Sequence, residues 1–233
     1  MAEIVLVGGA YLGAWAWERV TPELRAAGHE VTALTLTGFG DRAHLATPQT
    51  GLLVHATDIA SAIEVADLRT VTLVLHSYAG APGTVAADRV ADRLARVVYV
   101  AGVLPVPGRS GFEAAPPEFE QAITAYAGGD WKLPVFGDEI LDVYYGEHGL
   151  SAADKEWFRA RAVPQPLACY RDRTPEDLSA VEKLPRTYVS CAGDPGDPPY
   201  LPGWDTATIA SGHWPMITAP VELAALLDRL VRP

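Results

Sequence analysis

The sequence has few cysteines, fewer basic than acidic residues and no long apolar run, and each shortage excludes a class of protein. Only Cys169 and Cys191 occur among the 233 residues, too few for a disulfide framework or a four-cysteine metal site. Eighteen basic against 29 acidic residues give a net charge of −11, which argues against a nucleic-acid or anionic-membrane partner. The start MAEIVLVGG has no basic leader, and no apolar run has membrane-spanning length. We therefore expect a reduced, cytoplasmic protein that acts on a small molecule.

The acidic residues and the six histidines show no metal-ligand clustering, so neither a metal nor another cofactor is expected. Hydrophobic residues make up 49% of the chain and charged residues 20%, the balance of a globular protein. This length suffices for one sizeable core. The sequence leaves the oligomeric state open between a monomer and a homodimer.

Apolar β-type runs alternate with helical patterns along most of the chain. Strands are predicted at residues 3–7, 31–36, 71–75, 95–100, 186–191 and 206–210. Helices are predicted at residues 14–27, 55–68, directly after Ser77 and at the C-terminus, with Pro22 bending or restarting the first. Alternating β and α units predict an α/β fold: a mostly parallel central sheet with helices on both faces.

This alternation stops at Leu104-Pro105 and resumes near residue 185. Residues 105–184 hold many of the prolines and aromatic residues and no convincing strand. Weak helices are predicted near 116–127, 138–147 and 151–161. We therefore predict a core made of residues 1–104 and 185–233, with residues 105–184 inserted as a small, mainly helical segment.

One segment joins a buried strand to a small-residue helix. In TVTLVLHSYAGAPGTVAA, residues 70–87, a β-branched apolar run stops at His76-Ser77-Tyr78, and alanines and glycines follow at once. A strand that turns directly into such a helix is the setting of a nucleophile elbow, where a strained turn lifts a serine hydroxyl above the sheet edge. The pattern predicts Ser77 as a nucleophile, although a lone serine there is usually an ordinary turn residue.

A serine nucleophile needs a base, a carboxylate that orients the base, and N–H donors for the oxyanion. In an open α/β sheet these groups come from loops at the carboxyl ends of strands. Asp194 follows the strand RTYVSC, and His213 follows the short strand that ends at Ala210. These positions predict a triad of Ser77, His213 and Asp194. Asp197 stays open as the alternative acid, since Asp194 could simply begin an Asp-Pro turn.

These residues lie in segments that resemble a known family. VLVGGAYLGAWAW, GHEVTALTLTGFGDR, LHSYAG, VLP and SGHWPM are similar to the α/β-hydrolase superfamily, within it to the small esterase and hydroxynitrile-lyase group that includes plant methyl-ester esterases. The order Ser, Asp, His is the one found in α/β-hydrolases. The resemblance implies that Ser77 is the nucleophile, His213 the base and Asp194 the acid. It also implies an oxyanion hole made by the backbone N–H groups of Tyr78 and Ala10, and a cap over the pocket formed by the helical insertion, residues 105–184.

The chain departs from the family pattern beside the serine and after the first strand. The family usually has a small residue two positions before the serine, where this chain has Leu75, and a glycine two positions after it, where this chain has Ala79. It commonly has His-Gly after the first strand, where this chain has Gly8-Gly9. We expect Leu75 to distort the elbow and Gly8 to loosen the oxyanion loop.

Ester hydrolysis is the favoured activity. The cyanohydrin-cleaving branch of the resembled group uses a threonine in the first oxyanion loop and a lysine after the base, where this chain has Gly9 and Trp214. We predict a serine hydrolase that cleaves a small carboxylic ester through an acyl-enzyme. The alternatives are a non-hydrolytic enzyme on this scaffold (a lyase, a C–C bond-cleaving enzyme or a cyclase) and a ligand sensor. The substrate pocket is expected to be lined by Tyr11, Leu12, Val103, Trp131 and Trp214.

The loop GGAYLG also resembles a dinucleotide-binding turn, because it follows the first strand and opens a helix. It lacks the second glycine of that fingerprint, where Ala10 stands, and Thr37 replaces the acid expected after the second strand. A dinucleotide enzyme is therefore disfavoured.

Overall fold

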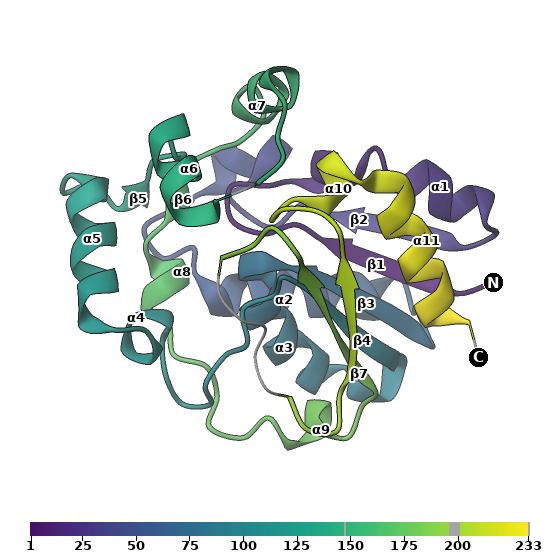
Figure 1. The fold of residues 1–233 in the computed structure, drawn as a ribbon. Helices are drawn as coiled ribbons and strands as arrows, with labels where there is room; N and C mark the ends of the chain where they lie inside the picture. The colour runs from purple at the N-terminus through teal and green to yellow at the C-terminus, as the bar shows by residue number, and fades with distance from the viewer. Residues whose placement is uncertain (147, 196–200, 233) are drawn as a thin grey trace.

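A parallel six-stranded sheet forms the centre of the protein (Figure 1). The structure is a computed structural model that describes residues 1–146, 148–195 and 201–232. All pairings in the sheet are parallel, so the carboxyl ends of its strands meet at one edge. In spatial order the strands are β2 (Glu30–Leu34), β1 (Glu3–Val7), β3 (Val71–His76), β4 (Leu94–Val100), β7 (Arg186–Cys191) and β8 (Asp205–Ile209). The predicted α/β class is confirmed.

Helices cover both faces of this sheet. One face carries α1 (Thr21–Ala26), α10 (Pro215–Thr218) and α11 (Pro220–Val231), and the other carries α2 (Leu52–Val65) and α3 (Gly80–Arg89) (Figure 1). Successive strand side chains point to opposite faces, so each strand supplies two separate apolar layers. In β1, Leu6 packs under α11, while Val5 and Val7 pack with α2.

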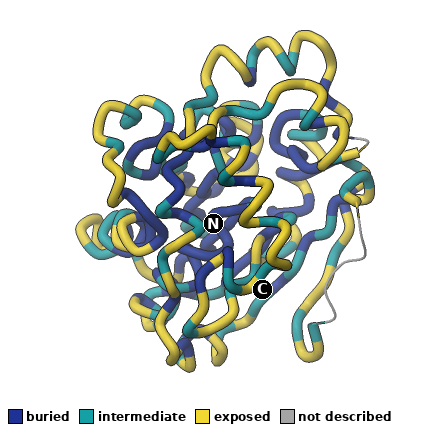
Figure 2. The backbone as a smooth tube through the Cα atoms, turned by 90° about the vertical axis from the view of Figure 1, so that its left-hand side faces the viewer, coloured by how far each residue is buried: buried dark blue, intermediate teal, exposed yellow. Residues whose placement is uncertain are grey.

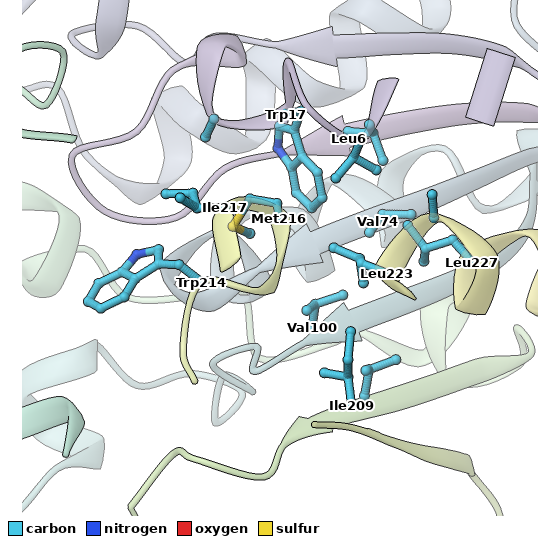
Figure 3. Packing of buried hydrophobic residues seen from close by; sticks show 14 of the residues in the cluster. Leu6, Trp17, Val74, Val100, Ile209, Trp214, Met216, Ile217, Leu223 and Leu227 are labelled. Carbon is cyan, nitrogen blue, oxygen red and sulfur yellow. The ribbon is translucent and has the colours of Figure 1, made fainter. Parts of the chain in front are cut away.

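The two apolar layers bury the strands almost completely. All six residues of β3 are buried, as expected for a strand covered on both faces. Figure 2 shows that the buried segments gather in the middle of the molecule and that the exposed ones lie at its periphery. Helix α11 buries its leucines at the spacing of one helical face. Figure 3 shows the layer on this side, to which the chain contributes Leu6, Trp17, Val74, Val100, Ile209, Met216, Leu223 and Leu227.

The predicted element boundaries differ from the structure where a local contact ends or begins an element. The second strand stops at Leu34, two residues early, and Thr35 Oγ1 then accepts a hydrogen bond from the N–H of Ala14. The predicted helix at 14–27 is a 3₁₀ turn, Ala14–Trp17, followed by α1 with Pro22 in its first turn. Helix α2 begins directly after Gly51, one turn earlier than predicted.

Residues 105–184 contain short helices, as predicted, but also a small sheet. Strand β5 (Lys132–Leu133) pairs antiparallel with β6 (Gln165–Pro166), so the expectation of no strand in this stretch is wrong. Two-residue strands leave too little periodicity to detect. The helices are α4 (Gly111–Ala114), α5 (Pro117–Ala127), α6 (Asp138–Tyr145), α7 (Ala152–Arg159), α8 (Ala168–Arg171) and α9 (Ser179–Glu182).

Helix α9 lies apart from the other helices of this stretch (Figure 1). It packs on α3, where the Asp88 carboxylate accepts hydrogen bonds from the N–H groups of Ala180 and Val181. The segments from α4 to α8 lie instead beside the carboxyl edge of the sheet (Figure 1). Within the described ranges, no helix has both the length and the apolar character needed to span a bilayer.

Candidate active site

Ser77 lies at the turn between β3 and α3. Its φ is 50°, a left-handed conformation that is rare for a residue with a side chain. A single 3₁₀ turn, Ser77–Ala79, leads directly into α3, and the Ser77 carbonyl accepts a hydrogen bond from Val103 N–H at 2.9 Å. The chain therefore makes the strained strand-to-helix turn that the sequence predicts.

The expected distortion by Leu75 does not occur, because Gly83 makes room for it. Leu75 is fully buried two residues before Ser77. A Cβ atom added to Gly83 of α3 would lie 2.2 Å from Leu75 Cδ2 and 2.5 Å from Cδ1. The leucine side chain thus occupies the space that any side chain at Gly83 would need.

Two other glycines allow the backbone to pack closely around the serine. A Cβ atom at Gly80 would lie 2.4 Å from the Val103 carbonyl oxygen, so α3 can begin against that loop only with glycine here. A Cβ atom at Gly9 would lie 2.7 Å from Ser77 Cβ. The small residues of the elbow therefore stand at Gly80 and Gly83, while Ala79 occupies the usual glycine position and is completely buried.

Ser77, His213 and Asp194 form one hydrogen-bonded chain. Ser77 Oγ lies 2.9 Å from His213 Nε2. His213 Nδ1 lies 3.0 and 3.1 Å from the two carboxylate oxygens of Asp194. Because a carboxylate only accepts, Nδ1 carries the proton and Nε2 is free to accept the serine proton. The alternative acid, Asp197, lies outside the described residues.

Aromatic side chains enclose the imidazole of His213. The Tyr145 ring centroid, at the end of α6, lies 4.5 Å from that of His213, and the Trp214 ring stands edge-on at 5.0 Å. Gly212, directly before His213, packs against the backbone of His148, where a Cβ would lie only 2.4 Å from backbone atoms. His213 is consequently only 8% exposed.

His76 connects the two loops on either side of Ser77. Its Nδ1 accepts a hydrogen bond from Gly9 N–H at 3.3 Å, and its Nε2 donates to the His213 carbonyl oxygen at 2.8 Å. Burial, with the nearby His213 second, lowers the His76 pKa well below its usual range. Neutral His76 therefore fixes the loop of Gly9 to the loop of His213 through two hydrogen bonds, and the predicted loosening by Gly8 is not seen.

The backbone N–H groups of Ala10 and Tyr78 come from two segments that meet at Ser77: Ala10 lines the same cavity as Ser77, and Tyr78 follows Ser77 in the 3₁₀ turn. Within the described part of the chain, Ala10 N–H donates to no backbone or side-chain acceptor. Tyr78 N–H lies in the first turn of a helix, where N–H groups lack intrahelical partners. The next residue after Ala10, Tyr11, has a φ of 68°, in the left-handed region that is rare for a non-glycine residue.

A buried histidine holds the Tyr78 side chain. The Tyr78 hydroxyl donates to His55 Nδ1 at 2.8 Å, and His55 Nε2 donates to the Thr37 carbonyl oxygen at 2.8 Å. Burial lowers the His55 pKa to about 4, so the ring is neutral near pH 7. Sequence reasoning missed His55, because no spacing relates it to the elbow.

Two cavities meet at Ser77 and Ala10. The smaller, of about 10 Å³, has room for about one water molecule. Its walls are Ala10, Tyr11, His76, Ser77, Phe136, Leu141, Tyr145, Phe158, His213 and Trp214. The larger, of about 420 Å³, extends from Ser77 past Val103 to α4 and α8. A third cavity, of about 390 Å³, lies between α5 and α6 and shares Phe119, Tyr145 and Tyr170 with the larger one.

The predicted pocket residues divide between these cavities and the core. Tyr11 and Trp214 line the small cavity, and Val103 lines the large one. Leu12 lines none of the three cavities; it is 1% exposed and packs in the layer under α11, so its prediction is corrected. Trp131 lines none either, because its ring lies beside β5 under the Lys132 ammonium, 4.6 Å from the centroid.

Sequence reasoning did not single out Tyr170 or Phe136 as site residues, and it could not choose Tyr145 from among the aromatic residues of 105–184. Tyr145 borders all three cavities, and Tyr170 and Phe136 each border two. The abundance of aromatic residues in 105–184 was the only signal, and it does not distinguish the residues that face Ser77. Across the described ranges, no three His, Cys, Asp or Glu side chains are grouped as metal ligands.

Comparison with known sequences identifies the family. The sequence model of the Alpha/beta hydrolase family matches residues 4–226. The chain belongs to the alpha/beta hydrolase family. Membership of this family agrees with three features described above: the strand order of the sheet, the turn at Ser77, and the order Ser, Asp, His along the chain.

Two relatives and one structure illustrate where the chain stands within the alpha/beta hydrolases. It is similar to the "Carbendazim hydrolyzing esterase" of Nocardioides sp. (strain SG-4G), with 36% identity over 99% of this chain and 100% of that protein. It is 28% identical to "Methylesterase 7" of Arabidopsis thaliana over 97% of this chain and 94% of that protein. An extracellular alpha/beta-hydrolase from a Paenibacillus species has the same fold, with a TM-score of 0.87 at 21% identity and 100% coverage of both chains.

Proposed function

We propose that this alpha/beta hydrolase cleaves carboxylic esters of a small alcohol by way of an acyl-enzyme. The observation that supports this most directly is the hydrogen-bonded chain from Ser77 through His213 to Asp194. The full-length similarity to a protein named as an esterase, and to a methylesterase, supports the same class of reaction.

In the proposed reaction Ser77 Oγ attacks the ester carbonyl carbon while His213 Nε2 takes its proton. Asp194 holds the imidazole in the required tautomer and stabilises the imidazolium that forms. The N–H groups of Ala10 and Tyr78 are the proposed donors to the oxyanion. His213 then protonates the leaving alkoxide, and in the second half-reaction it activates the water that releases the acid.

The unequal cavities suggest how the ester is oriented. The small cavity borders His213 and is closed by Trp214 and Tyr145, so it suits the alcohol portion and afterwards the attacking water. The cavity of about 420 Å³ is lined mostly by apolar side chains and suits the acyl portion. A methyl ester with a larger acyl group fits this arrangement.

The remaining expectations from the sequence stay proposals. We propose that the segments of 105–184 beside Ser77 act as a cap, and that the partner is a small molecule, with neither nucleic acid nor membrane bound. Both cysteines are free and buried, which agrees with a reducing location such as the cytoplasm. The hydrogen bond between Ser77 Oγ and His213 Nε2 favours hydrolysis over the ligand-sensor alternative, because it prepares the serine for proton transfer to the histidine.

Replacing Ser77 by alanine tests the proposal. We expect Ser77→Ala to lower kcat on p-nitrophenyl acetate and on methyl esters by about 10⁴- to 10⁶-fold, because the nucleophile is lost. Intact-protein mass spectrometry should show one fluorophosphonate adduct on the wild type and none on the variant. Ser61→Ala, on α2 away from the elbow, is the matched control and should retain full activity. Unchanged turnover in Ser77→Ala would show that another group performs the reaction.

A further inference from the structure

One charged residue, Arg109, is among those that line the large cavity. All other residues that line it are apolar or uncharged polar, and none is acidic. Arg109 lies in the stretch between Val103 and α4, on the same cavity as Ser77, and is exposed to solvent. Arg109 therefore brings a positive charge to a mostly apolar cavity in a protein whose net charge is −11.

The backbone of Arg109 is held in a defined turn. Arg109 N–H donates to the Val106 carbonyl oxygen at 3.1 Å, with Pro107 and Gly108 between them. Gly108 has a φ of 73°, and proline followed by such a glycine is the sequence of a type II turn. Thr174 fixes the turn from outside: its N–H donates to the Arg109 carbonyl oxygen and its hydroxyl to that of Val106.

The acidic groups near this turn leave the guanidinium free. The Glu113 carboxylate is bound to Arg173 and to the N–H of Ser110, and these contacts lower its pKa to about 2. Glu176 packs over Gly108 but forms no ion pair with Arg109. Among the described residues, the Arg109 side chain has neither a hydrogen-bond acceptor nor an acidic partner, unlike the ion-paired arginines at positions 19, 42, 89, 93 and 173.

We propose that Arg109 selects substrates whose acyl portion ends in an anion: half-esters of dicarboxylic acids, with the small-alcohol ester at Ser77 and the free carboxylate at Arg109. The planar guanidinium can bind a carboxylate through two parallel hydrogen bonds, while the apolar walls hold the carbon chain between the two ends. This inference rests on the proposed function, because it assigns the acyl portion to the large cavity.

The test compares monomethyl and dimethyl esters of the same dicarboxylic acids, from succinate to sebacate. For Arg109→Gln we expect the kcat/KM of the best monomethyl ester to fall by about 10-fold or more through KM, because a charge-assisted pair is lost. The dimethyl esters should change less than about twofold. Arg109→Lys should retain part of the preference. Rising NaCl should raise the wild-type KM for the monomethyl ester and leave that of Arg109→Gln unchanged.

Arg229→Gln is the matched control, because it removes the same charge from an exposed position on α11. It should leave the ratio of monomethyl to dimethyl kcat/KM as in the wild type. The inference is overturned if Arg109→Gln keeps that ratio, or if Arg229→Gln lowers it equally, which would make the effect one of net charge. If the wild type cleaves neither these esters nor p-nitrophenyl acetate, the proposed function fails, whereas cleavage of p-nitrophenyl acetate without a charge effect on the dicarboxylic esters removes the inference alone.

Discussion

At the scale of single residues, the proposed mechanism needs a carboxylate that orients His213. Two aspartates, Asp194 and Asp197, follow β7 in the sequence and are the candidates. Asp194 follows β7 directly, and both of its oxygens lie within 3.1 Å of His213 Nδ1. Its side chain is still 22% exposed, so water also reaches it. The geometry favours Asp194, and the two aspartates can be separated by substitution.

Asp194→Asn should lower kcat by about 10³- to 10⁴-fold with little change in KM, because an amide no longer holds the reactive tautomer of His213. Asp197→Asn is the matched variant three residues later in the sequence, and we expect near wild-type kcat. Steady-state kinetics on a methyl ester measures both. If Asp197→Asn shows the larger loss, the assignment of the acid must be exchanged.

At the scale of elements, β3 and α3 are fitted to each other across the elbow. Leu75 fills the space beside Gly83, so a larger residue on the strand is compensated by the absence of a side chain on the helix. The arrangement keeps Ser77 at its positive φ with an unusual residue two positions earlier. We therefore expect the effect of substituting one of these residues to depend on which residue stands at the other position.

A double-mutant cycle on Leu75 and Gly83 tests this fit. Gly83→Ala should lower the free energy of unfolding by about 1–3 kcal/mol, because the added methyl overlaps Leu75. Leu75→Ala should lower it by about 2–4 kcal/mol by leaving a cavity. In urea denaturation, the double variant should be more stable, by about 1–2 kcal/mol, than the sum of the two single losses in unfolding free energy predicts. Additive effects would mean that the two side chains do not share this space.

The same elements show what a sequence can and cannot predict. The alternation of β and α patterns places Ser77, Asp194 and His213 at strand ends, and parallel strands bring those ends to one edge. That rule is enough to bring the three side chains together. The compensation of Leu75 by Gly83 depends on the approach of a helix to a strand, and the position of Tyr145 over His213 depends on how irregular segments fold back. Neither leaves a periodic signal in the chain.

At the scale of the whole molecule, two buried histidines link the site to the pH dependence of folding. His55 and His76 both lie inside the protein, and burial lowers the pKa of each. Each ring connects separate segments: His55 joins the residue after Ser77 to Thr37, and His76 joins the loop after β1 to that of His213. Protonating either ring would place a charge in the interior and leave a donor where an acceptor is needed.

Acid should therefore destabilise the protein well before its carboxylates titrate. The pKa of His55 is about 4 when folded and about 6.5 when unfolded, so the unfolded state binds more protons between these values. The contribution of His55 to stability is complete above about pH 6.5 and is lost as pH falls towards 4, by up to about 3 kcal/mol, with His76 adding in the same direction. Urea denaturation of the wild type and of His55→Gln from pH 8 to 4.5 measures this, and the variant should show the flatter curve. Equal slopes for the two proteins would mean that His55 is not the group that titrates.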